Sequence, residues 1–199
     1  CFSFFPTKNI TTTEGGMLTT NSKSKYEKIK KIIAHGINKK LKKHFWHRES
    51  DLPGHNFRLP NHLAILGNNQ LQRLEEFNNK RRKIAKIYDS FFKKFSKYFE
   101  LQEVGSNYTH SYQMYTILVK KNLRNNLLYF MKKNNIEASA HFDPPLHMQR
   151  YLKRFNKSKL RNTERLSKEI MTLPMYPGLK LKEVKRVLFI IEKWSKKIK

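Results

Sequence analysis

Cysteine, acidic residues and long apolar runs are scarce in this sequence of 199 residues, and each shortage excludes a class of protein. The single cysteine, Cys1, has no partner in the chain, which excludes an internal disulfide framework and a cysteine-based zinc site. No apolar run reaches the roughly 18 residues that a membrane helix needs. With 38% hydrophobic and 13% aromatic residues, the chain can still bury a core. The composition predicts a soluble, cytoplasmic protein with no metal site and no membrane partner.

Acidic residues are outnumbered by basic ones, 15 against 42, which gives a net charge of +27. Such an excess raises a polyanionic partner as one interpretation. The lysines are, however, spread along the chain and mixed with asparagines, as on solvated helix faces. No RNP-like aromatic motif, Cys/His finger or RGG repeat accompanies the charge. Specific nucleic-acid binding is therefore unlikely from the sequence, but a basic nucleic-acid-binding protein stays open as an alternative.

The hydrophobic pattern predicts alternating strands and helices. A short aromatic strand at 1–5 and a second strand at 16–20 flank a loop. A capping box of Ser24 and Glu27 predicts the start of a helix that ends near Gly36. Beyond it we expect a polar loop at 44–60, a helix at 61–98 and a strand at 112–119. A helix at 123–133, an extended piece at 136–140 and a loop at 141–151 should follow. The chain should end with a helix at 160–171, a turn at 173–178 and a final helix from 181.

The segment 3–16 holds the residues that could carry chemistry. A lysine that reacts with a cofactor aldehyde must be uncharged, and the aromatic neighbours of Lys8 would favour that state by reducing its solvation. Gly15 and Gly16 leave room for the backbone to pack closely. Ser3, Thr7 and the threonines at 11–13 offer hydrogen-bond donors to a phosphate. On these residues alone the signal is weak, because most lysines are surface residues.

The same residues resemble the lysine segment of the DegT/DnrJ/EryC1/StrS sugar aminotransferases, which have the aspartate-aminotransferase fold. The resemblance begins with FSFFPTKNI at 2–10 and EGG at 14–16. It continues in order through HG at 35–36, HNFRL at 55–59, Ala64, QL at 70–71, Arg73 and Leu74, PLH at 145–147 with Gln149 and Tyr151, and TLPMYP at 172–177. Several spaced matches over essentially the whole chain are far more specific than one lysine.

This resemblance implies an α/β fold: a remnant of the large domain that binds pyridoxal 5′-phosphate at 1–75, then a small α+β domain at 76–199 reached through a long bridging helix. Lys8 would bind the cofactor covalently and move the proton, Ser3 would bind the cofactor phosphate, and Asn56 would reach the cofactor phosphate of the neighbouring subunit. The last role implies a homodimer with shared active sites. Arg58 and His147 are weaker candidates for substrate contacts, since each also suits a purely structural role.

The implied reaction is transfer of an amino group from glutamate to a nucleotide-linked keto sugar in surface-polysaccharide biosynthesis. Lysine at position 8 favours transamination over the dehydration that relatives with histidine there catalyse. Glu14 is more readily a turn residue than an acid catalyst. Family members are considerably longer, and the chain opens on Cys1. We therefore expect an incomplete chain that is inactive by itself, and a non-catalytic remnant stays open as a further alternative.

Overall fold

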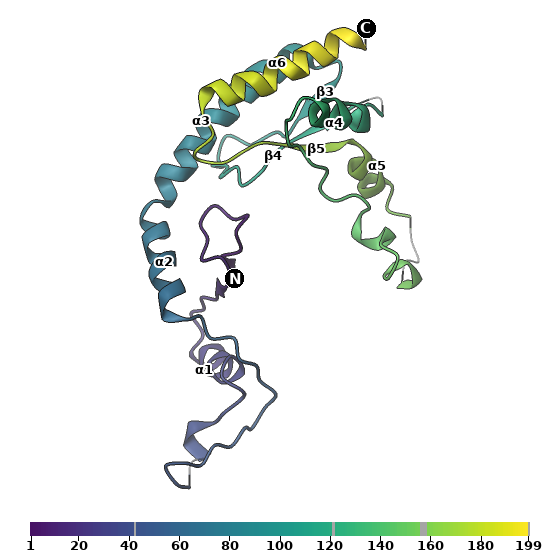
Figure 1. Cartoon of the computed structure of the whole chain (residues 1–199). Helices are drawn as coiled ribbons and strands as arrows, with labels where there is room; N and C mark the ends of the chain where they lie inside the picture. Colours follow the sequence, from purple (N-terminus) through teal and green to yellow (C-terminus); the bar gives the residue numbers. More distant parts are fainter. Residues whose placement is uncertain (42, 121, 156–158, 199) are drawn as a thin grey trace. The chain divides into compact units, whose positions relative to one another are not determined.

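A computed structural model describes residues 1–41, 43–120, 122–155 and 159–198. The chain divides into two compact units, Cys1–Leu74 and Glu75–Lys199 (Figure 1). Each unit has its own small sheet and its own helices, and each is described by itself below. Among the described residues, no helix combines the length and the apolar character needed to cross a membrane.

The first unit opens with two short antiparallel strands, β1 (Phe2–Ser3) and β2 (Gly16–Met17). Phe2 pairs with Met17 and Ser3 with Gly16, so the predicted strand–loop–strand arrangement is present in shortened form. Helix α1 (Lys23–Ile32) follows, then a 3-10 turn, η1 (Lys39–Leu41), and helix α2 (Asn61–Gln72). No apolar side chain described in this unit is fully buried.

The predicted capping box at the start of α1 is wrong. The N-cap is Ser22, whose Oγ accepts from the backbone N–H of Lys25 at 3.3 Å. Ser24 already lies within the first turn, where its side chain cannot act as the cap. The predicted end near Gly36 is only approximately right: α1 ends at Ile32 with Ile33 as its C-cap, and Gly36 lies in the turn beyond, with a left-handed φ of 71° that glycine adopts without strain. A Cβ atom there would also collide with the carbonyl oxygen of Leu52.

One continuous helix over 61–98 is likewise wrong. Two helices occupy the region, α2 and α3 (Leu74–Phe92), and they are separated at Arg73. The backbone of Arg73 has φ −101° and ψ 0°, and its N–H donates to Gln70 O at 3.1 Å, three residues back instead of four. The break could not be predicted from the sequence, because one tightened turn leaves the helical spacing of the apolar residues unchanged.

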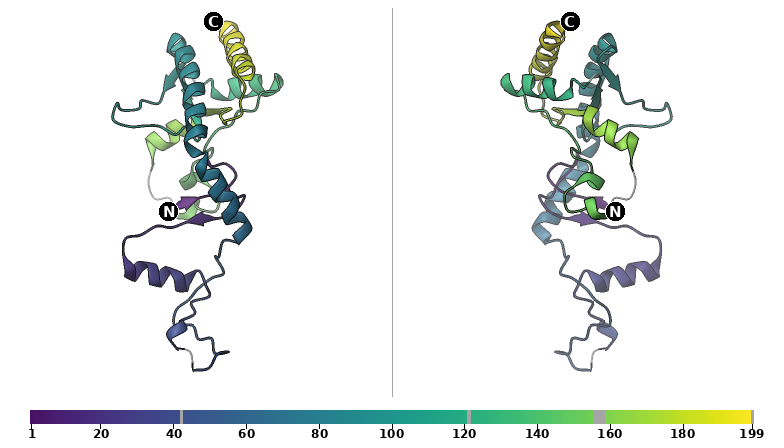
Figure 2. Two further views of the ribbon diagram at one scale, coloured as in Figure 1. Left: turned by 90° about the vertical axis from the view of Figure 1, so that its left-hand side faces the viewer. Right: turned by 90° about the vertical axis from the view of Figure 1, so that its right-hand side faces the viewer.

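The second unit contains α3 from Glu75 onward, the turn η2 (Lys93–Phe95) and an antiparallel sheet in the order β3-β4-β5. Its strands are β3 (Phe99–Leu101), β4 (Tyr115–Val119) and β5 (Ile170–Leu173). The other elements are α4 (Arg124–Lys133), the 3-10 turns η3 (Leu146–Met148) and η4 (Lys153–Phe155), α5 (Arg161–Glu169) and α6 (Leu181–Lys197). Helix α4 packs beside α6 (Figure 2).

The sheet was only partly predicted. Strand β4 was expected, but it begins at Tyr115, because Tyr112 has a positive φ of 45° that a strand does not allow. Strand β3 was not predicted, and β5 replaces the end of a predicted helix and the start of a predicted turn. At Ile170 the backbone turns to ψ 135°, which ends α5 and begins β5 without a connecting loop.

The hydrophobic core belongs entirely to this second unit. Alternate residues of β4, namely Tyr115, Ile117 and Val119, point to its buried side. The ring of Tyr88 on α3 lies 4.8 Å from that of Tyr115, and the ring of Trp194 on α6 lies 6.0 Å from that of Phe99 on β3. Trp194 also donates its indole N–H to Asn126 of α4 at 2.6 Å, which satisfies a polar group that burial would otherwise leave unpaired.

Candidate functional site

Lys8 lies on a loop that is closed at its base by β1 and β2. The N–H of Phe4 donates to Gly15 O and the N–H of Thr12 donates to Phe4 O, both at 3.0 Å. Inside the loop, the N–H of Lys8 donates to Phe5 O at 2.9 Å, a turn that contains Pro6 and Thr7. These backbone bonds hold the lysine at a defined place on the loop.

The loop packs against a second segment of the same unit. A Cβ atom at Gly15 would lie 2.7 Å from the Leu59 side chain, and one at Gly67 of α2 would lie 2.8 Å from Thr12. Thr12 is fully buried, so its methyl group rests on the helix backbone at Gly67. The two glycines therefore allow the lysine loop to sit on the start of α2.

The side chain of Lys8 is half-buried and has no ion-pair partner within the described ranges. Its aromatic neighbours do not enclose it as expected, because Phe2 is 54% exposed and Phe5 is 46% exposed. The desolvation predicted for this lysine is thus not supplied by those two rings in this chain. A covalent attachment point nonetheless requires an amine without an ion-pair partner, held at a fixed position, and among the described residues Lys8 meets this requirement.

Some hydroxyl groups around Lys8 donate hydrogen bonds within the loop, and one does not. Thr11 donates to Phe4 O at 2.8 Å and Thr12 to Glu14 O at 2.6 Å. Thr13 donates to Thr12 O at 2.5 Å, so the hydroxyl hydrogens of all three threonines are used within the loop. Ser3 Oγ only accepts a long bond from Phe5 N at 3.4 Å, and in the described chain it donates to nothing else.

Asn56 and Arg58 lie on an extended segment that runs antiparallel to the end of α1. His35 N donates to His55 O, and Phe57 N donates to Ile33 O, both at 3.0 Å. Both predicted side chains are exposed, and they meet: Arg58 Nε donates to Asn56 Oδ1 at 3.5 Å. This segment follows directly on Pro60 and the N-terminus of α2, the helix on which the lysine loop rests.

Asp51 ties the preceding loop to α1. Its Oδ2 accepts from Lys31 Nζ at 2.7 Å and from Asn38 Nδ2 at 2.6 Å. The hydrogen bond from Lys31 is the main cause that lowers the pKa of Asp51 below its usual value. Sequence reasoning missed this residue, because nothing in the spacing of Lys31, Asn38 and Asp51 shows that they converge.

His147 belongs to the second unit, on the turn η3. It is largely buried, and its Nε2 lies 3.4 Å from Glu164 Oε1 of α5. The same carboxylate oxygen accepts from Leu160 N at 3.0 Å, so Glu164 links the start of α5 to the imidazole. Glu164 was not singled out from the sequence.

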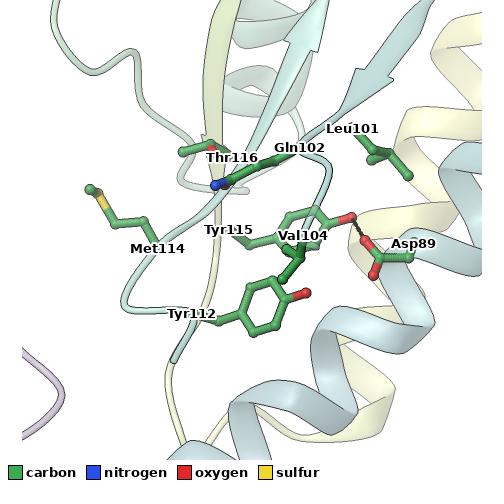
Figure 3. Close-up of a pocket in the computed structure, with 8 residues that line it drawn as sticks. All are labelled: Asp89, Leu101, Gln102, Val104, Tyr112, Met114, Tyr115 and Thr116. Atoms are coloured by element: carbon green, nitrogen blue, oxygen red, sulfur yellow. Dashed lines mark hydrogen bonds between the residues drawn. The ribbon is translucent and has the colours of Figure 1, made fainter. Parts of the chain in front are cut away.

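The second unit also has a shallow recess between α3, β4 and the chain after β3 (Figure 3). Its polar group is the carboxylate of Asp89, which accepts from the hydroxyl of Tyr115 at 2.6 Å. Burial, followed by the bond to Asp89, raises the pKa of Tyr115 above its usual range, and burial raises that of Tyr112. None of the predicted site residues lines this recess.

The groups around Lys8 fit part of a pyridoxal phosphate site. A free amine for the aldehyde and a free hydroxyl for a phosphate oxygen lie on one strand-and-loop unit, with Ser3 in register with Gly16. The side chain of Asn56 is exposed, and in the described chain its Oδ1 accepts only the long bond from Arg58 Nε at 3.5 Å. The side chains of Phe2 and Phe5 beside Lys8 are exposed, so no other residue in the described ranges covers them fully.

Comparison with known proteins agrees with this chemistry. The sequence pattern of the DegT/DnrJ/EryC1/StrS aminotransferase family matches residues 1–192. The chain is 33% identical over 206 residues to UDP-4-amino-4,6-dideoxy-N-acetyl-beta-L-altrosamine transaminase of Campylobacter jejuni, covering 98% of this chain and 53% of the relative. It is 31% identical over 188 residues to GDP-perosamine synthase of Escherichia coli O157:H7, covering 92% and 48%.

Solved structures give the same result. Helicobacter pylori PseC, an aminotransferase of pseudoaminic acid biosynthesis, superimposes with a TM-score of 0.87 at 31% identity, over 96% of this chain and 52% of that one. The predicted mixed α/β fold is thereby confirmed, and the chain spans about half the length of the relatives that it matches. It belongs to the DegT/DnrJ/EryC1/StrS aminotransferase family, whose cofactor is pyridoxal 5′-phosphate.

Proposed function

We propose that the whole protein, of which this chain would be the C-terminal portion, transfers an amino group from glutamate to a nucleotide-linked keto sugar. The product would enter surface-polysaccharide biosynthesis in the cytoplasm. The observation that carries the proposal is the uncommitted amine of Lys8 on its closed loop, in a chain whose family match extends over residues 1–192. The named relatives that act on UDP- and GDP-linked amino sugars support the class of substrate.

Lys8 would attach the cofactor through its amine, and Ser3 would donate its hydroxyl hydrogen to the cofactor phosphate. When bound, pyridoxal phosphate supplies an electron sink that makes the donor's C–H bond acidic. The amine of Lys8, once released, would take that proton from the donor carbon as general base. It would then deliver the proton to a carbon of the cofactor as general acid. Because the amine has no ion-pair partner in the described part of the chain, no carboxylate competes for it.

Arg58 and His147 would contact the substrate. Arg58 is exposed, and its only described bond is the long one to Asn56 at 3.5 Å, so its guanidinium can pair with a diphosphate. His147 is held by Glu164 at 3.4 Å and would offer its other ring nitrogen. Residues 1–75 would complete a cofactor-binding domain, and residues 76–199 would form the small domain.

Covalent trapping tests the assignment of Lys8. Full-length protein is treated with pyridoxal phosphate and borohydride, and the modified peptide is identified by mass spectrometry. We expect the adduct at Lys8 and its loss in Lys8→Arg. The matched control, Lys25→Arg on α1, should keep the adduct, because Lys25 is exposed and away from the loop. A protein with no adduct, or with an adduct elsewhere, would contradict the aminotransferase assignment.

Mixed dimers test the shared active site. If Asn56 reaches the cofactor of the neighbouring subunit, a dimer of one Lys8→Arg chain and one Asn56→Ala chain contains one site with both native residues. Mixing the two inactive full-length variants should therefore restore part of the activity. Mixtures that remain as inactive as either variant would show that Asn56 does not serve the partner's cofactor.

The 199-residue chain alone should have little or no transaminase activity, because it spans about half of its relatives. Adding the preceding half as a separate polypeptide should restore cofactor binding. Full activity of the isolated chain would overturn this expectation and would require all cofactor contacts to come from the residues described above.

A further inference from the structure

Helix α6 has an exposed face whose fully exposed charged residues are all cationic, with one partly exposed carboxylate, that of Glu192, beside them. The exposed charged residues are Lys182, Lys185, Arg186, Lys193, Lys196 and Lys197. The opposite face is buried in the core through Val184, Val187, Ile190, Ile191, Trp194 and Ser195. The orientation of α6 is thus fixed by packing, and its basic face is directed outward.

The two acidic residues of α6 are both engaged, although the side chain of Glu192 is 42% exposed beside the face. Glu183 accepts from the backbone N–H of Lys180 at 2.7 Å and so closes the N-terminal turn. Glu192 pairs with Lys196 at 2.8 Å, which leaves the remaining lysines of the face without a carboxylate of their own helix. By contrast, the N-terminal half of α3 carries Glu75 and Glu76, which pair with Arg82 and Lys80 at 2.5 Å each.

Apolar side chains stand among these cations. Phe189 is 63% exposed, and it shares one strip of α6 with Lys182, Lys185 and Lys193 at intervals of three or four residues. Tyr129 of the adjacent helix α4 is 75% exposed. Next to it in sequence, the ring of Phe130 lies 5.3 Å below Lys197 Nζ. Phe189 and Tyr129 thus place apolar rings next to the cations of these two helices.

We propose that the basic face of α6, with Phe189 at its centre, binds the surface of an anionic lipid membrane. Lysine side chains attract acidic headgroups, and an aromatic ring among them can enter the interfacial region. We favour a lipid surface over a nucleic acid because an apolar interface can take up the exposed ring of Phe189, whereas phosphates alone would pair only with the lysines. The binding is peripheral and needs no membrane-spanning helix.

Vesicle sedimentation tests the proposal. The 199-residue chain is mixed with phosphatidylcholine vesicles with or without phosphatidylglycerol, and we expect binding only to the anionic vesicles, weakened by salt. Replacing Lys182, Lys185 and Lys193 together by glutamine should weaken binding by about a hundredfold, at roughly fivefold for each lysine. Phe189→Ser should weaken it severalfold with no change in charge.

The matched control removes the same charge from another surface. Lys83, Lys86 and Lys94, on α3 and η2, are exposed, and their replacement by glutamine should change vesicle binding far less. An equal loss in the control would overturn the proposal, because attraction would then follow net charge alone. So would an absence of binding to anionic vesicles, or tighter binding to RNA that depends on the same three lysines.

The fluorescence of a tryptophan at position 189 tests whether this position enters the membrane interface. Phe189→Trp should show blue-shifted fluorescence on adding anionic vesicles, relative to the native chain with its two tryptophans. An unshifted spectrum in a variant that sediments with vesicles would show that position 189 does not enter the interface, and would overturn its proposed role.

Discussion

Gly16 of β2 lies against the carbonyl oxygen of Phe2, to which a Cβ atom at position 16 would approach within 2.7 Å. That oxygen is part of strand β1, which cannot move without opening the loop that carries Lys8. The absence of one side chain therefore sets the distance between the two strands at the base of the candidate site.

Gly16→Ala should weaken cofactor binding by the full-length protein about tenfold, because overpacking of this kind costs about 1–3 kcal/mol. The measurement is a titration with pyridoxal phosphate followed by absorbance. Gly178→Ala is the matched control, since a Cβ atom there would meet only the Tyr176 ring at an ordinary 3.7 Å. Equal affinities of the two variants would show that the spacing of β1 and β2 does not matter for the site.

Arg81 stabilises the second unit through three backbone carbonyls. Its Nη1 donates to Tyr112 O and Gln113 O at 3.1 Å and to Met175 O at 3.0 Å, and the side chain is buried. Arg81→Met should lower the free energy of unfolding by about 3 kcal/mol, because it leaves buried carbonyls without a donor. Urea unfolding followed by circular dichroism measures the change.

Arg82→Met provides the comparison for Arg81. Arg82 pairs with Glu75 at the surface, where such pairs contribute about 0–1 kcal/mol. A loss as large as that of Arg81→Met would indicate that helix α3 itself, and not the carbonyl contacts, determines the effect.

The second unit should lose stability in alkaline solution. Burial raises the pKa of Tyr88 and of Tyr115, so the fold favours the neutral phenol. The two tyrosines make their full contribution to the free energy of unfolding below about pH 10, the pKa of tyrosine in the unfolded chain. The contribution decreases as the pH rises above that value. Urea unfolding between neutral pH and strongly alkaline pH measures the slope.

Tyr115→Phe should reduce the alkaline slope, and a second change, Tyr88→Phe, should reduce it further. Tyr129→Phe should leave it unchanged, because Tyr129 is 75% exposed. A slope that is the same in all these proteins would mean that other groups cause the alkaline loss.

Local signals in the sequence predicted the features that depend on neighbouring residues. Gly36 marked a left-handed turn, and apolar spacing located α4 and α6. Strand β5 was missed because its pairing partner, β4, lies some fifty residues earlier, and Ile170 to Leu173 continue the apolar spacing of α5. The break at Arg73 was missed because one tightened turn leaves that spacing intact.

The candidate site shows the same division. Lys8 was predicted from its neighbours and from the family resemblance and remains a prediction, but the contacts of each neighbour needed the structure. Thr11 and Thr12 have the hydroxyls expected to face a phosphate, and the backbone of the loop uses both of them. Asp51 and Glu164 were missed because each is defined by partners distant in the chain: Asp51 by Lys31 and Asn38, and Glu164 by His147.

In the described residues, every fully buried apolar side chain lies between Ile84 and Trp194. Heat absorbed on unfolding comes mostly from such a core, at about 0.7 kcal/mol per residue near 60 °C. The second unit alone corresponds to about 90 kcal/mol on that scale, against about 140 kcal/mol for a chain of 199 cooperative residues. A calorimetric enthalpy near the lower value would mean that the segment bearing Lys8 does not belong to the cooperatively folded part of this chain.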